Sequence, residues 1–258
     1  MASVGDGRRE ADPEMPALLE VAGLRKAYGA IAVAADVTFS LALGECLGMI
    51  GPNGAGKSSL FNLIAGTVAP DAGTIRFDGR DLMGLPAHLR ARLGIVRAFQ
   101  IPQPFPHLTV YENVLAATSF GAGLAGAEAE TRAVEALAIT GLAEKARVLA
   151  GHLPLLDRKR LELGKALATG ARLLLLDEIA AGLTEREVEG LVALIAEFKV
   201  DHAIIWIEHI PHALRAVADR ILVLHFGKAV LDGPPSEVMA SRVVREIYMG
   251  FGTADDAA

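Results

Sequence analysis

The chain has 258 residues, of which 52% are hydrophobic and 22% charged, as in a globular protein with one large domain or two small ones. Its formal net charge of −6 gives no indication of the basic face that binds nucleic-acid backbones, so we expect no nucleic-acid partner. The single cysteine, Cys46, excludes an internal disulfide, and its apolar neighbours favour a small core residue over a nucleophile.

No part of the sequence has the pattern of a membrane-spanning segment. Residues 1–15 are polar, lack the apolar core of a signal peptide and are expected to form a flexible tail. The longest apolar runs, such as Leu173–Leu176 and Ala203–Ile207, are strand-sized, whereas a membrane-spanning helix needs roughly 18 to 20 apolar residues. We therefore expect a soluble chain that can serve a membrane only through a partner.

The first third of the chain alternates strand and helix patterns. Two strand-like stretches begin at Leu18, and their sequences are LLEVAGLRKAY and VTFSLALGECLGMIG. A glycine-rich turn follows, then an amphipathic helix over Lys57–Ala65 that ends at Gly66, and a short strand within Gly73–Gly79.

The composition changes at about Pro102, where the loop PQPFPH begins. Alanine-rich helices and then a second alternation of strands and helices are predicted. The expected elements are helices at Val110–Phe120 and Ala127–Leu142, a buried strand at Leu173–Asp177, a helix at Glu185–Phe198, a strand in HAIIWIEH, a helix at Pro211–Ala218, a hairpin in RILVLHFGKAVLDG and a closing helix at Val238–Tyr248. This order indicates an α/β domain over residues 16–252, with a helical subdomain at about 102–165 and a C-terminal tail at 253–258.

A glycine-rich loop precedes the first helix. Its residues match G-x-x-x-x-G-K-[ST] throughout and are Gly51, Pro52, Asn53, Gly54, Ala55, Gly56, Lys57 and Ser58. Such a loop points successive backbone N–H groups at phosphates, and the helix N-terminus adds positive charge. We expect Lys57 to reach the β- and γ-phosphates, Ser58 to hold Mg²⁺ and the adjacent Ser59 to belong to the same site. The alternative is a chance glycine turn.

Two acids follow the leucines Leu173–Leu176. A carboxylate at the end of a buried strand lies beside a phosphate loop, so Asp177 is expected to hold Mg²⁺ and Glu178 to act as general base for the attacking water. His209, after the next apolar strand, could hold that water in line with Glu178. Alternatively, Asp177 and Glu178 are solvated acids at the end of one strand, and His209 is an ordinary hydrogen-bonded histidine at the end of the next.

These motifs, in this order, resemble the nucleotide-binding subunit of an ABC transporter over about residues 18–250. The resemblance implies a P-loop NTPase core with a mixed β-sheet and a helical subdomain, and hydrolysis of ATP with Mg²⁺. It assigns catalysis to Glu178, His209 and Gln100, and places Gln100 at Mg²⁺ as well. It also implies that Tyr28 stacks on adenine, for which a half-buried strand aromatic is the alternative.

One branch of this family is similar in more detail. The stretches GPNGAGKSSLFNLIAG, GIVRAFQ, LTVYENV and VVREIYMGFG resemble the ATP-binding subunits of importers for branched-chain amino acids, and of related amide or urea importers. The branch implies a motor for solute uptake that sits at the cytoplasmic face of the inner (plasma) membrane through integral permease subunits. The segment from Phe99 to Phe105 would contact those subunits, although a surface loop with a packed phenylalanine is the alternative.

The sequence departs from the family at its signature motif, L-S-G-G-Q. The corresponding residues are Leu153, Pro154, Leu155, Leu156 and Asp157. In the family, two subunits face head to tail, and each signature closes over the ATP of the other. Pro154 offers no hydroxyl or N–H to a phosphate, and the two leucines obstruct the close backbone approach that glycine permits. Asp157 would bring a negative charge near the phosphate, and like charges about 4 Å apart repel by roughly 4 kcal/mol at an effective dielectric constant of about 20. Alternatively, Asp157 caps the following helix and faces away.

This departure predicts a heterodimer, in which a second nucleotide-binding subunit with an intact signature completes the site at Lys57. Three other functions stay open: a motor for another cargo such as a lipid exporter, a soluble ABC ATPase acting on DNA or ribosomes, and a subunit that binds ATP without turnover. The single domain without basic segments disfavours the second, and the presence of Glu178 and His209 disfavours the third.

Overall fold

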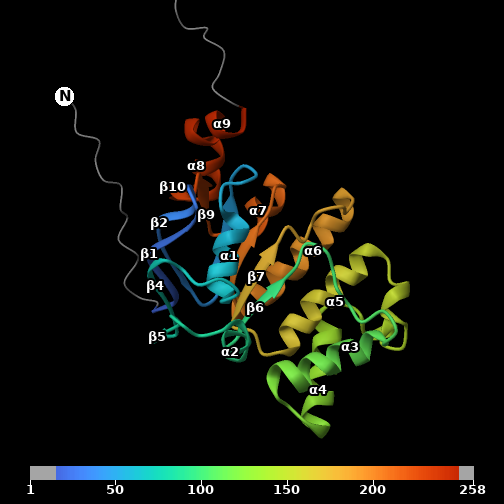
Figure 1. Cartoon of the computed structure of the whole chain (residues 1–258). Coiled ribbons are helices and arrows are strands. Elements are labelled where there is room, and N and C mark those ends of the chain that lie inside the picture. Colours follow the sequence, from blue (N-terminus) through green and yellow to red (C-terminus); the bar gives the residue numbers. More distant parts are fainter. Residues whose placement is uncertain (1–15, 250–258) are drawn as a thin grey trace, which may run out of the picture.

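The computed structural model describes residues 16–249, and the tails expected at 1–15 and 253–258 lie outside the described residues (Figure 1). The strands are β1 (Ala17–Tyr28), β2 (Ile31–Ala42), β3 (Cys46–Ile50), β4 (Ala72–Phe77), β5 (Arg80–Asp81), β6 (Ile95–Ala98), β7 (Leu173–Asp177), β8 (Ala203–Ile207), β9 (Arg220–His225) and β10 (Lys228–Gly233). The helices are α1 (Lys57–Ala65), α2 (Ala87–Arg92), α3 (Val110–Ala116), α4 (Gly126–Ile139), α5 (Leu155–Ala168), α6 (Glu185–Phe198), α7 (Pro211–Val217), α8 (Pro235–Ala240) and α9 (Arg242–Met249), and a π-helical turn over Ala117–Ala122 continues α3.

Two sheets organise these elements. The larger sheet has the order β10-β9-β3-β8-β7-β6, in which β10 is antiparallel to β9 and the other neighbours run parallel. A second, antiparallel sheet of order β2-β1-β4-β5 shares a hydrophobic core with the larger sheet and α1. The mixed sheet flanked by helices confirms the predicted α/β class.

The leucine run in β7 shows why both faces of the larger sheet are covered. Successive side chains of a strand point to opposite faces. Leu173 and Leu175 therefore enter the core shared with α1, whereas Leu174 and Leu176 enter a second core formed with α5, α6 and α7. Cys46 is buried in this second core, as predicted, and burial raises the pKa of its thiol.

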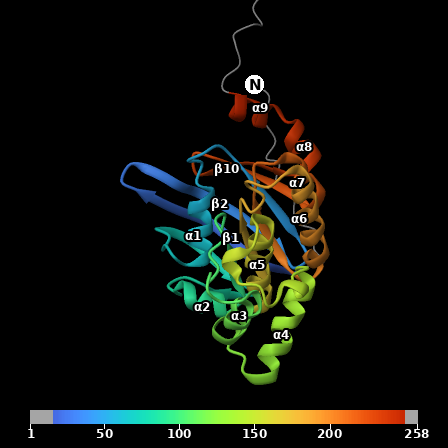
Figure 2. The ribbon, with the colours of Figure 1, turned by 90° about the vertical axis from the view of Figure 1, so that its right-hand side faces the viewer.

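The helices α3, α4 and α5 form a group beside the larger sheet, at the lower right of Figure 1, with a small core of their own. In Figure 2 this group faces the viewer, with α5 in front of the sheet and α3 and α4 toward the lower end, while α8 and α9 lie at the upper end of the molecule. Along α5, Leu161 belongs to the core of the helical group and Leu163 to that of the sheet. This helix therefore fixes the helical group against the sheet.

The continuous closing helix predicted over Val238–Tyr248 is wrong, because the chain breaks at Ser241 into α8 and α9. Ser241 has an extended backbone, and its Oγ accepts the N–H of Val244 at 3.2 Å, so the serine caps a new helix instead of continuing the first. Within residues 16–249, no helix has both the length and the apolarity to cross a membrane.

Candidate nucleotide-binding and catalytic site

The carboxyl ends of four parallel strands gather at one edge of the larger sheet. Ala98 at the end of β6 pairs with Leu176 of β7, and Asp177 pairs with Ile207 at the end of β8. Ile207 also pairs with Met49 of β3, which leads into the glycine-rich loop. Residues that follow these strands are therefore brought together although they lie far apart in the sequence.

The loop at residues 51–58 joins β3 to α1 and requires glycine at two positions. Gly51 and Gly56 have φ values of 155° and 105°, which side chains disfavour. A Cβ atom on Gly51 would lie 2.2 Å from the carbonyl oxygen of Leu224, and one on Gly56 would lie 2.2 Å from that of Val33. The motif is thus used for its backbone geometry, as expected of a phosphate-binding loop.

Lys57 projects into this loop. Its Nζ donates to the carbonyl oxygens of Gly51 at 2.5 Å and Pro52 at 3.1 Å, and the side chain is buried. Burial lowers the pKa of Lys57, while the nearby carboxylates of Glu178 and Asp177 oppose that change. An ammonium group is therefore held inside the loop and faces the two acids that follow β7.

Glu178 is held at both carboxylate oxygens. Gln100 Nε2 donates to Oε2 at 2.7 Å, and His209 Nε2 lies 3.0 Å from Oε1. Glu178 also has a φ of 45°, which is uncommon for a residue other than glycine and places it at a sharp turn after β7. The structure thus brings together the three residues predicted to be catalytic, with Glu178 between the other two.

The three residues predicted to hold Mg²⁺ supply oxygen ligands, which this cation prefers. Ser58 is exposed at the start of α1, and Asp177 ends β7. Gln100 uses its amide nitrogen toward Glu178, which leaves its amide oxygen for another partner. The donor set therefore fits Mg²⁺.

Arg97 is a residue of this site that the sequence reasoning missed. It projects from β6, forms an ion pair with Asp177 and donates to Asn62 Oδ1 on α1 at 2.7 Å. Its guanidinium carbon lies 5.6 Å from the ring centre of Phe61 and 4.9 Å from that of Phe99. A lone arginine in an otherwise apolar strand, in the stretch VRAFQ, is the signal that could have identified it.

Tyr28 ends β1, in the hairpin with β2. Its side chain is 53% exposed, and the ammonium group of Lys26 lies 5.5 Å from the ring centre. A residue at the end of a strand with about half of its surface exposed also fits the alternative of a half-buried strand aromatic. Stacking on adenine remains a prediction that an exposed ring permits.

Asp157 faces into its own helical group, as one alternative for it expected, but it does not cap the helix. Its side chain is only 5% exposed and forms an ion pair with Lys145, and Arg160 NH1 lies 4.0 Å from its other oxygen. Because cations accompany this carboxylate, the repulsion of a phosphate expected from Asp157 is offset by Lys145 and Arg160. Capping by Asp157 is wrong, since Pro154 occupies the cap position of α5 and Asp157 is the third helical residue.

The other residues of the degenerate signature surround the start of α5. Leu153 is buried, Pro154 has no capping side chain, and Leu155 is an exposed leucine in the first turn. A Cβ atom on Gly182, in the loop after Glu178, would lie 3.2 Å from Cδ2 of Leu155. Leucine side chains therefore stand where the family motif has glycine.

Known proteins resemble this chain over most of its length. The sequence profile of the family described as ABC transporter matches residues 34–181, more than half of the chain. The chain belongs to the ABC transporter family. It is 36% identical over 249 residues to the high-affinity branched-chain amino acid transport ATP-binding protein BraF of Pseudomonas aeruginosa, with 90% of this chain and 98% of BraF covered. It is 34% identical over 238 residues to the lipopolysaccharide export system ATP-binding protein LptB of Acidithiobacillus ferridurans, with 92% and 98% covered.

Among solved structures, the ADP conformation of MJ1267, an ATP-binding cassette of an ABC transporter, superposes with a TM-score of 0.83 at 27% identity. The match covers 91% of this chain and 99% of that cassette. The protein is thus an ABC ATPase that binds and hydrolyses ATP as the motor subunit of a transporter. The predicted class of fold and of activity is confirmed.

Proposed function

We propose that this ABC ATPase drives the uptake of branched-chain amino acids or related small polar solutes. The proposal is supported by 36% identity over 90% of the chain to a subunit named for branched-chain amino acid transport. A relative named for lipopolysaccharide export is 34% identical, which makes a lipid-exporting motor the second candidate. The test is uptake of labelled leucine by cells that lack the chromosomal copy and carry the wild type or Lys57→Ala. Equal uptake by both strains would refute import.

We propose that hydrolysis uses Glu178 as general base. The observation that supports this role is the contact of Gln100 and His209 with its two oxygens. The phosphate loop and Lys57 would bind the triphosphate, and Asp177, with Ser58 and Gln100, would hold Mg²⁺, which neutralises phosphate charge. The test is ATP turnover of Glu178→Gln, which should bind ATP normally and hydrolyse it slowly.

We propose a head-to-tail heterodimer with a second nucleotide-binding subunit. Two chains of this sequence would present Pro154 and exposed leucine at both composite sites, whereas a partner with an intact signature would supply the missing groups at this chain's phosphate loop. Mixing the purified chain with candidate partner subunits tests this. Full turnover by the chain alone, with no gain from any partner, would refute the heterodimer.

We propose that residues 16–252 form the ATPase unit, with the helical subdomain at about 102–165, and that it binds the permease at the cytoplasmic face of the inner membrane. The proposed contact surface follows β6 and exposes Phe99 at 48%, Ile101 at 71% and Phe105 at 58%. Phe105 is thus not packed, contrary to the alternative weighed for it. Co-purification with permease subunits should be lost when Ile101 and Phe105 are replaced by serine and kept when the exposed Phe120 is replaced.

A further inference from the structure

The two side chains that hold Glu178 lie on loops. Gln100 follows the end of β6, His209 follows the end of β8, and each is bonded to one oxygen of Glu178. A side chain on a loop keeps its position only as well as its backbone is fixed. The contacts that fix these two backbones therefore decide how well Glu178 is oriented.

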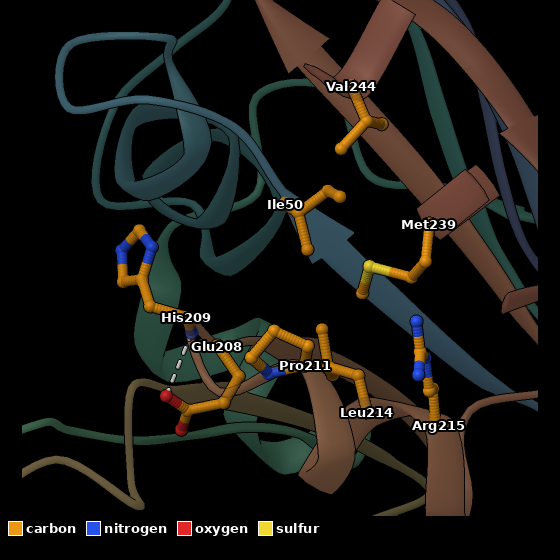
Figure 3. Close-up of a pocket in the computed structure, with 8 residues that line it drawn as sticks. All are labelled: Ile50, Glu208, His209, Pro211, Leu214, Arg215, Met239 and Val244. Atoms are coloured by element: carbon orange, nitrogen blue, oxygen red, sulfur yellow. Dashed lines mark hydrogen bonds between the residues drawn. The ribbon is translucent and has the colours of Figure 1, made fainter. Parts of the chain in front are cut away.

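Glu208 fixes the backbone next to His209. Its Oε1 accepts the N–H of His209 at 2.9 Å, and its Oε2 accepts the N–H of Ala180 at 3.1 Å, in the loop that follows Glu178. Figure 3 shows the carboxylate bonded to the His209 N–H on the side of the chain opposite the imidazole. One buried carboxylate thus joins the two loops that carry Glu178 and His209.

Close packing does not fix this loop from its other side. A cavity of about 290 Å³ lies against Glu208 and His209, and its other walls come from β3, α7, α8 and α9 (Figure 3). The side chains that complete it are Ile50, Pro211, Leu214, Arg215, Met239 and Val244. Because packing contacts are missing where side chains line a cavity, the hydrogen bonds to Glu208 become the contacts that set the position of His209.

Lys159 fixes the backbone of Gln100 in a comparable way. It projects from α5, is buried, and donates through Nζ to the carbonyl oxygen of Gln100 at 3.1 Å. Burial lowers the pKa of Lys159, and the Glu208 carboxylate opposes that change, so opposite charges face each other across the site. The helix α5, which follows Pro154, is thus linked to the loop of Gln100.

We propose that Glu208 and Lys159 are positioning residues for ATP hydrolysis, with Glu208 holding His209 and Lys159 holding Gln100, so that together they orient Glu178. The inference rests on the proposed role of Glu178 as general base. Both residues act through the neighbours that they hold and not through contact with the reacting atoms.

The test compares Glu208→Gln and Lys159→Met, in the full-length chain, with matched controls at the opposite end of the larger sheet. Asp219 accepts the N–H of Cys46, the first residue of β3, at 2.8 Å, and Lys199 donates to the carbonyl oxygen of Val217 at 3.0 Å. Lys199 and Asp219 also form an ion pair with each other at 2.6 Å. Asp219→Asn and Lys199→Met therefore weaken the same kinds of hydrogen bond to the backbone far from Glu178, together with this ion pair, so they are the more disruptive substitutions.

Hydrogen exchange measures the loop backbone directly and does not depend on turnover. Glu208→Gln should speed exchange of the Ala180 or the His209 amide by about tenfold. The glutamine amide has one acceptor oxygen for these two donors, so one hydrogen bond is lost, and one hydrogen bond is worth about a factor of ten. Asp219→Asn should instead affect the segment at Cys46. Exchange at the two loop amides that is unchanged in Glu208→Gln would overturn the proposal.

Turnover then separates positioning from general stability, in the assembly in which the wild type is active. Glu208→Gln should lower kcat by about tenfold and change KM for ATP by less than about twofold. In a His209→Ala background, Glu208→Gln should add less than about twofold, because the backbone that Glu208 holds at position 209 then carries no imidazole to position. A loss of equal size in both backgrounds, or one confined to KM, would refute the role.

A second double-mutant comparison combines Lys159→Met with Gln100→Ala. The variant Lys159→Arg, which keeps a hydrogen-bond donor, should retain most of the wild-type turnover. Fluorescence of Trp206, the only tryptophan of the chain and a buried residue of β8, verifies that each variant is folded. Normal turnover by Glu178→Gln would refute the proposed base, and it would leave the exchange result to decide what Glu208 and Lys159 hold.

Discussion

The phosphate loop and the degenerate signature are built alike, yet only one is equipped to hold a phosphate. Each is a loop that leads into the N-terminus of a helix, α1 in one case and α5 in the other. Gly56 turns with positive φ into α1 and has no side chain in front of the N–H groups. Pro154 precedes α5 with φ of −64°, and an exposed leucine follows. A helix N-terminus serves a phosphate only where side chains leave its N–H groups accessible.

The two regions also differ in what surrounds their aspartates. Asp177 pairs with Arg97 and faces Lys57, so it remains part of the site. Asp157 is paired with Lys145, and its side chain is buried within the helical group. The role of a charged residue at a motif position therefore depends on the partner with which it is paired. Four predictions follow from this difference between the phosphate loop and the degenerate signature.

The largest expected effect is on turnover. Glu178→Gln should reduce it by about 10³-fold, within the range for removal of a general base, with ATP affinity kept. Asp157→Asn is the same chemical change on the signature side and should alter turnover by less than about threefold, since that carboxylate is directed at Lys145. Steady-state ATPase assays check both variants, and similar losses would break the contrast.

The ion pairs should differ in their contribution to stability. Arg97→Met leaves a largely buried aspartate without its partner and should lower the free energy of unfolding by about 2 kcal/mol. Lys145→Met should cost less than about 1 kcal/mol, because Lys145 is 46% exposed and Arg160 stays near Asp157. Urea unfolding followed by tryptophan fluorescence measures both values, and the reverse order would contradict the prediction.

Restoring the signature should have a smaller effect. The triple change Pro154→Ser, Leu155→Gly and Leu156→Gly should raise turnover of the chain without a partner by about tenfold, the value of one hydrogen bond to a charged group. Leu155→Ala with Leu156→Ala removes bulk without adding a hydroxyl and serves as the control. No increase in the triple variant, at normal folding, would mean that the signature side does not limit turnover.

The smallest effect concerns pH. Burial raises the pKa of Glu208, although two N–H groups donate to it. The folded state therefore keeps this proton to higher pH than the unfolded state, and the free energy of unfolding should fall as pH rises from the ordinary glutamate pKa of about 4.3 through the raised value. Glu208→Gln should remove that fall, which urea unfolding between about pH 4 and 7 can detect. Parallel curves for the two proteins would contradict it.

The sequence by itself determined the parts of this protein that depend on neighbouring residues. The glycine-rich loop predicted α1 within its observed bounds, because a phosphate loop and its helix are continuous in the chain. Four successive leucines predicted a strand buried on both faces, and β7 is such a strand. The acids after it and His209 after the next strand could be placed together, because parallel strands end at one edge of a sheet.

Tertiary structure alone decided which charges are paired and which loops are held. Arg97 and Asp177 are 80 residues apart, and Ala180 and Glu208 are 28 apart, so no local pattern reveals these contacts. The inward turn of Asp157 depends likewise on where Lys145 of the helical group lies. A buried polar group must find a partner, and which partner it finds depends on how distant segments pack.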